Sequence, residues 1–451
     1  TCAAITVFVA MLPASISASA YVWAEPLVTL CFLDTVSAAL RFVDDPRIGT
    51  AYRPIVWSAL GYLAHGRLLP LAAVAVLLVV AVAWRRANRR LAAFAVALGA
   101  ALLVAVQIVT AIVHRAVWTN ADDTNTVVET LRRLGRPSEL VEWGAGQLWY
   151  QLVTTAGLFG FGVVVLVRAA AQRQPSGGLV RPRDARVLLA FTVPLVALSV
   201  LFMAGRMRSD HMIYGRYTDA IAWPVIAIAL AWLIRNTTTA RSRDLTLSIV
   251  GVSIACLISA GVVHRRFGAA LESDIGVAAM VAGLFPFIGD RGATGVFLPT
   301  ALAILVLMVV LVVMSAPRRR DHVLVVVAVG LLAIGALQTA DGLGRGLNSF
   351  ARSSDVRAVR DIVPTGSTIG YHFVAKDEPS MVFTDAQRRG AQLYQMYLPD
   401  YRIEVDHGLA DDVGPYVFAP RADPELTEAG AVILWESSDI GMDLWLEPTA
   451  P

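Results

Sequence analysis

The sequence predicts a mostly α-helical, polytopic membrane protein with a small α/β domain at its C-terminal end. Of its 451 residues, 56% are hydrophobic and only 16% are charged, whereas soluble domains average roughly 45–50% and 25%. The mean hydropathy of +0.61 over the whole chain requires several segments that are more apolar than a globular core, while residues 340–451 stay polar. These observations exclude an ordinary soluble protein.

Apolar runs long enough to be candidate membrane helices recur between residues 1 and 339. The run 55–84 is too long for one crossing of a hydrocarbon core roughly 30 Å thick, at about 1.5 Å per residue. Its centre carries His65, Gly66 and Arg67, which predicts a tight helical hairpin that turns there. The complete set of runs covers 3–20, 26–41, 55–84, 91–113, 147–167, 187–204, 218–234, 245–263, 293–314 and 322–339.

The arginines of the connecting loops predict the orientation. With a hairpin at 55–84, one set of loops holds most of the arginines, which makes that set cytoplasmic by the positive-inside rule. The sequence therefore predicts about eleven crossings, a location in the plasma membrane and an extracytoplasmic C-terminal domain. The cytoplasmic set is Arg41, Arg47, Arg53, Arg85, Arg86, Arg89, Arg90, Arg168, Arg173, Arg181, Arg183, Arg186, Arg235, Arg241, Arg243, Arg318, Arg319 and Arg320.

The composition changes beyond about Asp341 to that of a soluble α/β domain. We therefore divide the chain into a transmembrane helical domain at 1–339 and a soluble domain at 340–451. Helical spacing in SDVRAVRDIV is broken at 364–366 before STIGYHFV, which has a strand pattern. A second helix is predicted at DAQRRGAQLYQMYL, followed by short strands at YRIEV, PYVFAP, AVILWES and MDLWLEP.

Catalytic motifs of soluble enzymes do not occur in the sequence. Walker A, Gly-x-Gly-x-x-Gly, His-Glu-x-x-His and Gly-x-Ser-x-Gly patterns are all missing. The three cysteines, Cys2, Cys31 and Cys256, lie far apart within apolar runs, and we expect them to be buried thiols. Ionisable groups at membrane depth cost roughly 2.5–3.5 kcal/mol to insert, so those beside the apolar runs are the candidates for function.

Glu25 is the first candidate, because it stands directly before Pro26 at the start of an apolar run. A carboxylate at the outer end of a helix suits general-base work, or binding of a divalent metal ion such as Mg²⁺ or Mn²⁺. The alternative is that Glu25 only complements the helix dipole.

The second candidate is the segment RMRSDHMIYGRYTDAIAWP. Its arginines lie on the predicted outer side, contrary to the positive-inside rule that the other loops follow. Arginine forks bind phosphate bidentately, so the segment predicts a phosphate site; attraction to anionic lipid headgroups is the alternative. Its candidate binding residues are Arg206, Arg208, His211, Arg216 and Tyr217.

The third candidate is the hairpin tip HGRLLP, which carries His65 and Arg67. A solvated turn is the alternative there. We expect structural roles for three further groups: the acidic residues of loop 114–146, the basic residues 264–266, and Asp34 within its apolar run.

The arrangement of these segments resembles polyprenyl-phosphate-dependent membrane glycosyltransferases of the GT-C fold, which include dolichyl-phosphate-mannose-protein mannosyltransferases. The stretch from Ala3 to Arg41 is similar to the family's helix, acidic turn and helix, with Glu25 at an acidic position. The stretch GYLAHGRLLPLAAVAVLLV resembles the following hairpin, although Leu68 follows Arg67 where the family has proline. YGRYTDAIAWPVIAIAL resembles a later helix start.

The resemblance implies an inverting transfer of a sugar from a polyprenyl-phosphate donor to a cell-envelope glycan, lipid or protein. Glu25 would orient the acceptor or a divalent metal ion, and Arg216 with Tyr217 would hold the leaving phosphate. The implied partners are the lipid-linked sugar, membrane lipid and the envelope acceptor, with no nucleic acid. The chain begins at Thr1, and we expect the family's main catalytic aspartate to precede it.

Two other classes of protein fit the same sequence. A multi-pass transporter or flippase also has many helices and charges within the membrane, although it needs no outer domain. A lipid-linked polysaccharide ligase or polymerase shares the outward arginine and histidine clusters.

The predicted orientation is testable by cysteine labelling in intact cells. We expect a membrane-impermeant maleimide to modify a cysteine introduced at Lys376 and to leave one introduced at Arg86 unmodified until the cells are opened. Protection of the cysteine at position 376 would contradict the orientation.

Overall fold

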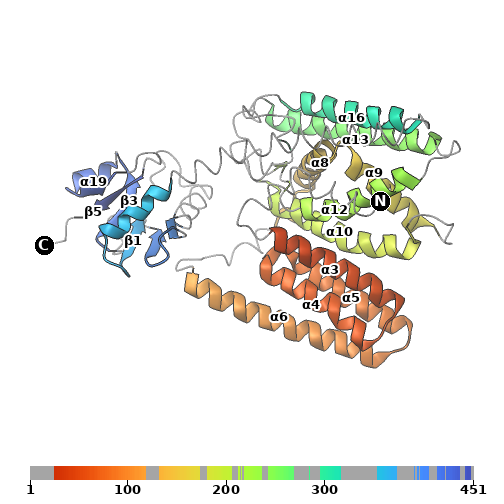
Figure 1. Cartoon of the computed structure of the whole chain (residues 1–451), viewed down its shortest axis with the longest axis horizontal. Helices are drawn as coiled ribbons and strands as arrows, with labels where there is room; N and C mark the ends of the chain where they lie inside the picture. Colours follow the sequence, from red (N-terminus) through yellow and green to blue (C-terminus); the bar gives the residue numbers. More distant parts are fainter. Residues whose placement is uncertain are drawn as a thin grey trace. The chain divides into compact units, whose positions relative to one another are not determined.

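The computed structural model of the chain describes two compact units, which are drawn in Figure 1. The larger unit is helical and comprises Thr1–Val113 and Asp123–Leu343, and the smaller comprises His114–Asp122 and Gly344–Pro451. The predicted boundary between 339 and 340 lies outside the described residues. Those residues are 25–117, 132–172, 180–205, 212–213, 215, 218–235, 242–268, 284, 295–315, 353–372, 391, 394–395, 397–405, 414–421, 423–436 and 442–447.

The larger unit is a bundle of apolar helices (Figure 1). Its helices are α3 (Glu25–Asp44), α4 (Ile48–Ala64), η1 (Gly66–Leu68), α5 (Leu69–Arg85), α6 (Arg89–Val117), η2 (Arg133–Gly135), α8 (Pro137–Thr154), α9 (Leu158–Ala171), α10 (Pro182–Met203), α12 (Asp219–Arg235), α13 (Ser242–Phe267) and α16 (Phe297–Ser315).

Five helical segments in the described part of the chain are long and apolar enough to cross a membrane, and the bent pair of α8 and α9 would make a sixth. The protein is therefore a multi-pass membrane protein. The prediction of about eleven crossings is wrong. The five segments are Glu25–Asp44, Gly66–Arg85, Arg89–Val113, Pro182–Met203 and Thr246–Phe267.

The difference has a physical reason. Apolar composition does not distinguish a helix that crosses the bilayer from a shorter helix buried among its neighbours. Helix α4 has only 17 residues and contains Pro54, and the apolar parts of α12 and α16 are also short. The predicted runs 3–20 and 322–339 lie outside the described residues.

The hairpin predicted within 55–84 is present. Helix α4 ends at Ala64, η1 makes the turn, and α5 begins at Leu69. His65 leaves the helical conformation with φ −155° and ψ 116°. Its Nδ1 atom accepts a hydrogen bond from the backbone N–H of Arg67 at 3.3 Å, which holds the tip together.

Helices α8 and α9 meet at an angle of 109°. The break lies at Ala156 and Gly157, whose φ angles of 45° and 77° are left-handed. The Thr155 hydroxyl accepts a hydrogen bond from the N–H of Phe159 at 3.1 Å and donates one to the carbonyl of Gln151 at 2.6 Å. These bonds occupy backbone groups that the break would otherwise leave unsatisfied in an apolar interior.

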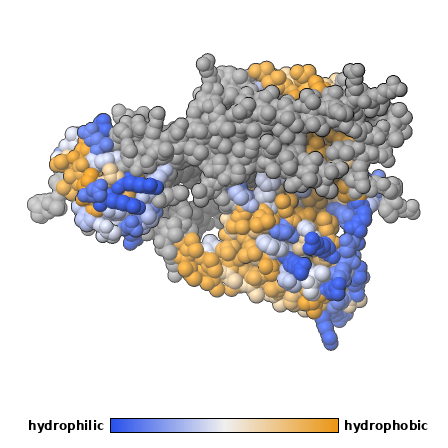
Figure 2. All heavy atoms as spheres, viewed as in Figure 1, coloured by the Kyte–Doolittle hydropathy of each residue, from blue (hydrophilic) through white to orange (hydrophobic). Residues whose placement is uncertain are grey.

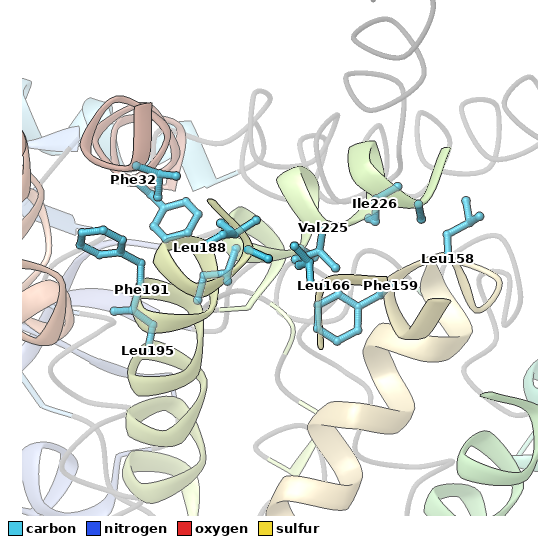
Figure 3. Packing of buried hydrophobic residues seen from close by; sticks show 14 of the residues in the cluster. Phe32, Leu158, Phe159, Leu166, Leu188, Phe191, Leu195, Val225 and Ile226 are labelled. Atoms are coloured by element: carbon cyan, nitrogen blue, oxygen red, sulfur yellow. The ribbon is translucent and has the colours of Figure 1, made fainter. Parts of the chain in front are cut away.

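Close packing of large apolar side chains joins the helices (Figure 3). Phe32 of α3 lies beside Leu188 and Phe191 of α10, while Leu166 of α9 lies beside Val225 of α12. Cys31 and Cys256 are buried in the bundle as expected.

The outside of the bundle is apolar as well. Exposed valines, leucines and isoleucines cover α6, and Ile112 for example is 61% exposed. Figure 2 shows hydrophobic surface over the lower helices and hydrophilic surface at one end. Such a surface suits contact with lipid chains.

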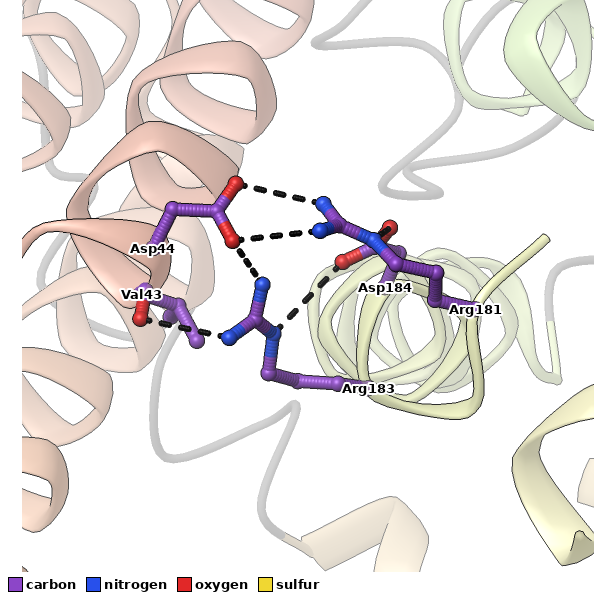
Figure 4. Close-up of polar contacts among 5 residues, drawn as sticks. All are labelled: Val43, Asp44, Arg181, Arg183 and Asp184. Atoms are coloured by element: carbon purple, nitrogen blue, oxygen red, sulfur yellow. Dashed lines mark hydrogen bonds and ion pairs between the residues drawn. The ribbon is translucent and has the colours of Figure 1, made fainter. Parts of the chain in front are cut away.

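Ion pairs join α3 to the start of α10 (Figure 4). Arg181 donates to the Asp44 carboxylate at 3.1 and 3.3 Å and to Asp184 at 2.6 Å, and these partners raise the pKa of Arg181. Arg183 donates to Asp44 and, at 3.5 Å, to the carbonyl of Val43. The structure thus brings together two loops of the set predicted to be cytoplasmic.

The smaller unit contains a mixed five-stranded sheet in the order β2-β1-β3-β5-β4. Strands β2 and β3 run parallel to β1, whereas β5 is antiparallel to β3 and β4, which confirms the small C-terminal α/β domain. Its elements are η7 (Ser353–Asp361), β1 (Thr368–Tyr371), β2 (Arg402–Val405), β3 (Tyr416–Pro420), α19 (Pro424–Glu428), β4 (Val432–Trp435) and β5 (Met442–Leu446).

Aromatic side chains fill the core of this domain. The rings of Tyr371 and Tyr394 pack edge to face with their centres 5.2 Å apart, and the ring centres of Phe418 and Tyr394 are 4.5 Å apart. Burial raises the pKa of Tyr371 to about 12. The first predicted helix is a 3₁₀ helix at Ser353–Asp361, and the second lies largely outside the described residues.

The break between α8 and α9 is testable at Gly157. A Cβ atom there would lie 3.0 Å from Leu307 and 3.1 Å from Val252, and φ is +77°. We expect Gly157→Ala to lower the free energy of unfolding by about 1–2 kcal/mol, the cost of a left-handed L-residue. Thermal and denaturant unfolding in detergent would measure this loss. Gly251→Ala is the matched control, since a Cβ there meets nothing within 4 Å, and equal stabilities of the two variants would contradict the assignment.

Candidate functional site

The structure places three of the predicted site residues. Glu25 is the first residue of α3, and His65 and Arg67 lie at the hairpin tip. The remaining five, Arg206, Arg208, His211, Arg216 and Tyr217, lie outside the described residues.

Glu25 is only 7% exposed, although it begins its helix. Helix α3 packs against α12, whose first residue is the acid Asp219, and the charges of Glu25 and Asp219 repel each other. A residue that only caps a helix needs neither burial nor a second acid beside it. The surroundings therefore favour a chemical role for Glu25 over a purely structural one.

Asp219 is held in place by two side chains of α8. Its Oδ1 atom accepts a hydrogen bond from Nε2 of Gln151 at 2.8 Å, and its Oδ2 atom accepts one from the Tyr150 hydroxyl at 3.2 Å. The Gln151 amide also donates to Thr218 Oγ1 at 2.8 Å. Glu25, Tyr150, Gln151, Thr218 and Asp219 are called the carboxylate cluster below.

The cluster forms because the segment before α12 comes very close to α8. A Cβ on Gly215 would lie 2.0 Å from ring atoms of Tyr150, and one on Gly146 would lie 2.6 Å from the carbonyl oxygen of Met212. Glycine at these two positions therefore lets the segment reach the helix. Thr218 closes the turn by donating from its hydroxyl to the carbonyl of Gly215 at 3.1 Å.

The sequence patterns did not indicate Asp219, Tyr150 and Gln151 as site residues. For Asp219 a signal existed, because it begins an apolar helix as Glu25 does, and it follows Arg216 and Tyr217 closely. For Tyr150 and Gln151 we find no such signal, since both lie within an apolar run and only the fold brings them to Asp219.

At the hairpin tip, the Arg67 guanidinium lies 3.6 Å from the centre of the Phe202 ring. The carbonyl of Phe202 accepts a hydrogen bond from Arg133. Arg67, Arg133 and Phe202 are called the arginine–phenylalanine cluster below. Arg67 therefore stacks on an aromatic ring of another helix.

An apolar cavity of about 510 Å³ is lined by residues that lie close in the sequence to members of this cluster. Leu134 follows Arg133, Leu201 precedes Phe202, and Pro70 lies just beyond Arg67. The cavity is lined by Pro70, Leu134, Leu140, Pro194, Ala197, Leu198, Val200 and Leu201. Its lining suits a hydrocarbon chain.

A third set of charged groups serves packing, as the sequence predicts for residues 264–266. The Arg266 guanidinium lies 5.7 Å from the centre of the Trp143 ring and 3.9 Å from the Glu142 carboxylate. The His264 ring lies 4.9 Å from that of Phe297. These contacts join α8, α13 and α16.

Within the described ranges, no group of three or more His, Cys, Asp or Glu side chains is arranged to hold a metal ion. The carboxylate cluster offers two acids, Glu25 and Asp219. Mg²⁺ is commonly bound by one or two carboxylates together with phosphate oxygens of the substrate, so this pair fits such an ion when a phosphate is bound.

No protein-family model, curated protein or solved structure matches this chain.

The role of the close approach is testable at Gly215. Its Cβ would overlap the Tyr150 ring, so we expect Gly215→Ala to cost about 1–3 kcal/mol of stability, the usual range for overpacking. Gly66→Ala is the control, because a Cβ there meets nothing within 4 Å. Unfolding measurements on the double variant Gly215→Ala/Tyr150→Ala should recover part of the loss, and strictly additive losses would contradict the contact.

Proposed function

We propose that the protein is an integral membrane glycosyltransferase that moves a sugar from a polyprenyl-phosphate donor to an extracytoplasmic acceptor. The observation that carries the proposal is the carboxylate cluster. Two acids, Glu25 and Asp219, begin two apolar helices that pack against each other, and side chains of α8 donate hydrogen bonds to Asp219. Such a pair in an apolar setting suits acid–base chemistry on a hydroxyl group.

In the proposed reaction, Glu25 removes the proton of an acceptor hydroxyl. The hydroxyl oxygen then forms a bond to the anomeric carbon of the sugar, and the bond from that carbon to the phosphate oxygen breaks. The polyprenyl phosphate leaves with the electron pair, and the anomeric configuration inverts. Asp219, fixed by Tyr150 and Gln151, orients the acceptor beside Glu25.

The donor lipid needs an apolar binding site for its hydrocarbon chain and cations that bind its phosphate. The 510 Å³ cavity supplies apolar walls; in the sequence, Arg133 is next to the lining residue Leu134, and Arg67 is three positions before Pro70. Arg216 precedes the carboxylate cluster by two positions, and in the proposal it holds the leaving phosphate with Tyr217. Guanidinium groups stabilise the charge that develops on this oxygen.

Binding of a divalent metal ion is the alternative to the base role of Glu25. Glu25 and Asp219 would hold Mg²⁺ or Mn²⁺, and when bound the ion would neutralise charge on the donor phosphate.

A transporter or flippase is the second candidate, and the bend between α8 and α9 favours it. Transporters commonly place broken helices at their substrate sites, and here the 109° bend follows directly after the residues that hold Asp219. A transporter moves the lipid-linked sugar without breaking its bond to phosphate, whereas the transferase breaks it. A ligase or polymerase would also break a bond to phosphate but would need a lipid-linked glycan as its donor.

The proposal is tested with the purified protein in lipid nanodiscs and polyprenyl phosphates carrying radiolabelled mannose, glucose, galactose or arabinose. We expect label from one of them to pass to an added envelope extract. Glu25→Gln should lower this turnover by about 10²-fold or more, the lower range for acid–base groups, with an unchanged thermal midpoint.

The control is Asp44→Asn, which removes a carboxylate near the other end of α3 and should leave turnover unchanged. Near wild-type transfer by Glu25→Gln would show that Glu25 is only a helix cap. Movement of intact lipid-linked sugar across the bilayer, without transfer of label, would favour the transporter.

A further inference from the structure

Gln147 is a buried polar residue of α8 that the proposed chemistry does not use. Its side chain belongs to a residue only 2% exposed. Within the described part of the structure, neither its Nε2 atom nor its Oε1 atom has a hydrogen-bond partner. An amide buried without a partner is unfavourable, and native proteins rarely retain one unless water or a ligand completes its bonds.

Gln151 lies one helical turn further along α8 and is also 2% exposed. Its Nε2 atom donates to Asp219 and Thr218, but its Oε1 atom has no partner in the same part of the structure. Residues four positions apart lie on one face of a helix. The two amides therefore extend the carboxylate cluster along α8.

The hydrogen-bonding character of these side chains indicates the chemistry of the ligand. The amide of Gln147 both donates and accepts, the Oε1 atom of Gln151 accepts, and the carboxylates of Glu25 and Asp219 accept. Without a bound metal ion, a phosphate would be repelled by the two carboxylates, and as a dianion it could not donate to them. A neutral group with several hydroxyls both donates and accepts, and it carries no charge.

We propose that Gln147 and Gln151 bind the hydroxyl groups of the sugar carried by the donor lipid. The polar face of α8 then distinguishes a sugar-loaded polyprenyl phosphate from the bare lipid phosphate that is left after transfer. This inference rests on the proposed function, because it assigns the sugar-recognition residues of the same site.

The experiment measures two dissociation constants for the full-length protein in detergent micelles. The probes are radiolabelled polyprenyl phosphate carrying the sugar that the wild type transfers, and the same polyprenyl phosphate without a sugar. Gln147→Leu keeps the approximate size of the side chain and removes its hydrogen bonds. We expect it to weaken binding of the loaded lipid by about 10- to 30-fold, the scale for one or two hydrogen bonds, and to leave binding of the bare lipid unchanged.

Thr192→Val is the matched control. Thr192 is a buried residue of α10 whose hydroxyl also has no partner in the described part of the structure, but it is not in the carboxylate cluster. We expect its replacement to change neither dissociation constant. Gln147→Met is a second, unbranched replacement for use if Gln147→Leu does not fold. We expect it to weaken binding of the loaded lipid selectively as well.

The outcomes separate the two proposals. Equal weakening of both lipids, or no weakening of either, would overturn the role of Gln147 while leaving the proposed function in place. Equal binding of the loaded and bare lipids by the wild type would also overturn the role of Gln147 and leave the proposed function in place. A wild-type protein that binds neither lipid would contradict the proposed function itself.

Discussion

The absence of water from the hydrocarbon core governs how this bundle is built. Every polar group that enters such a core must find its partner within the protein. At the break between α8 and α9, the Thr155 hydroxyl takes over bonds that the helix loses. At the start of α12, Tyr150 and Gln151 supply the bonds of Asp219. The same constraint leaves the exterior of α6 to apolar side chains.

This constraint separates two kinds of charged cluster. Asp44, Arg181 and Arg183 form exposed ion pairs, which water and salt weaken, so each contributes little to stability. The cluster of Glu25 and Asp219 lies among buried side chains, where unlike the exposed pairs its charges are only weakly screened. In the buried environment, fixed dipoles act more strongly than in water, so they stabilise the charge that develops during a proton transfer more effectively.

The sequence was sufficient for the class of protein, the hairpin at His65, the burial of Cys31 and Cys256, and the α/β character of the C-terminal domain; Cys2 lies outside the described residues. It overestimated the crossings, because the apolar helices in α12 and α16 are shorter than membrane spans and α4 has only 17 residues. It also missed Asp219 as a partner of Glu25, since the residues that hold Asp219 lie 68 and 69 positions earlier in the chain. Neighbours of this kind arise from the packing of α3, α8 and α12, which residue spacing along one helix does not reveal.

Under the proposed function, the two kinds of site in the bundle would bind the two ends of a lipid-linked sugar. A polyprenyl phosphate needs apolar walls and cations, and the cavity with Arg67 and Arg133 beside it in sequence provides both. A sugar needs neutral donors and acceptors, and α8 with the two carboxylates provides those. Without a bound metal ion, placing the anionic group beside the carboxylates would cost Coulomb energy, and placing the sugar among the leucines would leave its hydroxyls without partners. In the proposed function, the donor would therefore place its phosphate at the cations and its sugar at the polar face of α8.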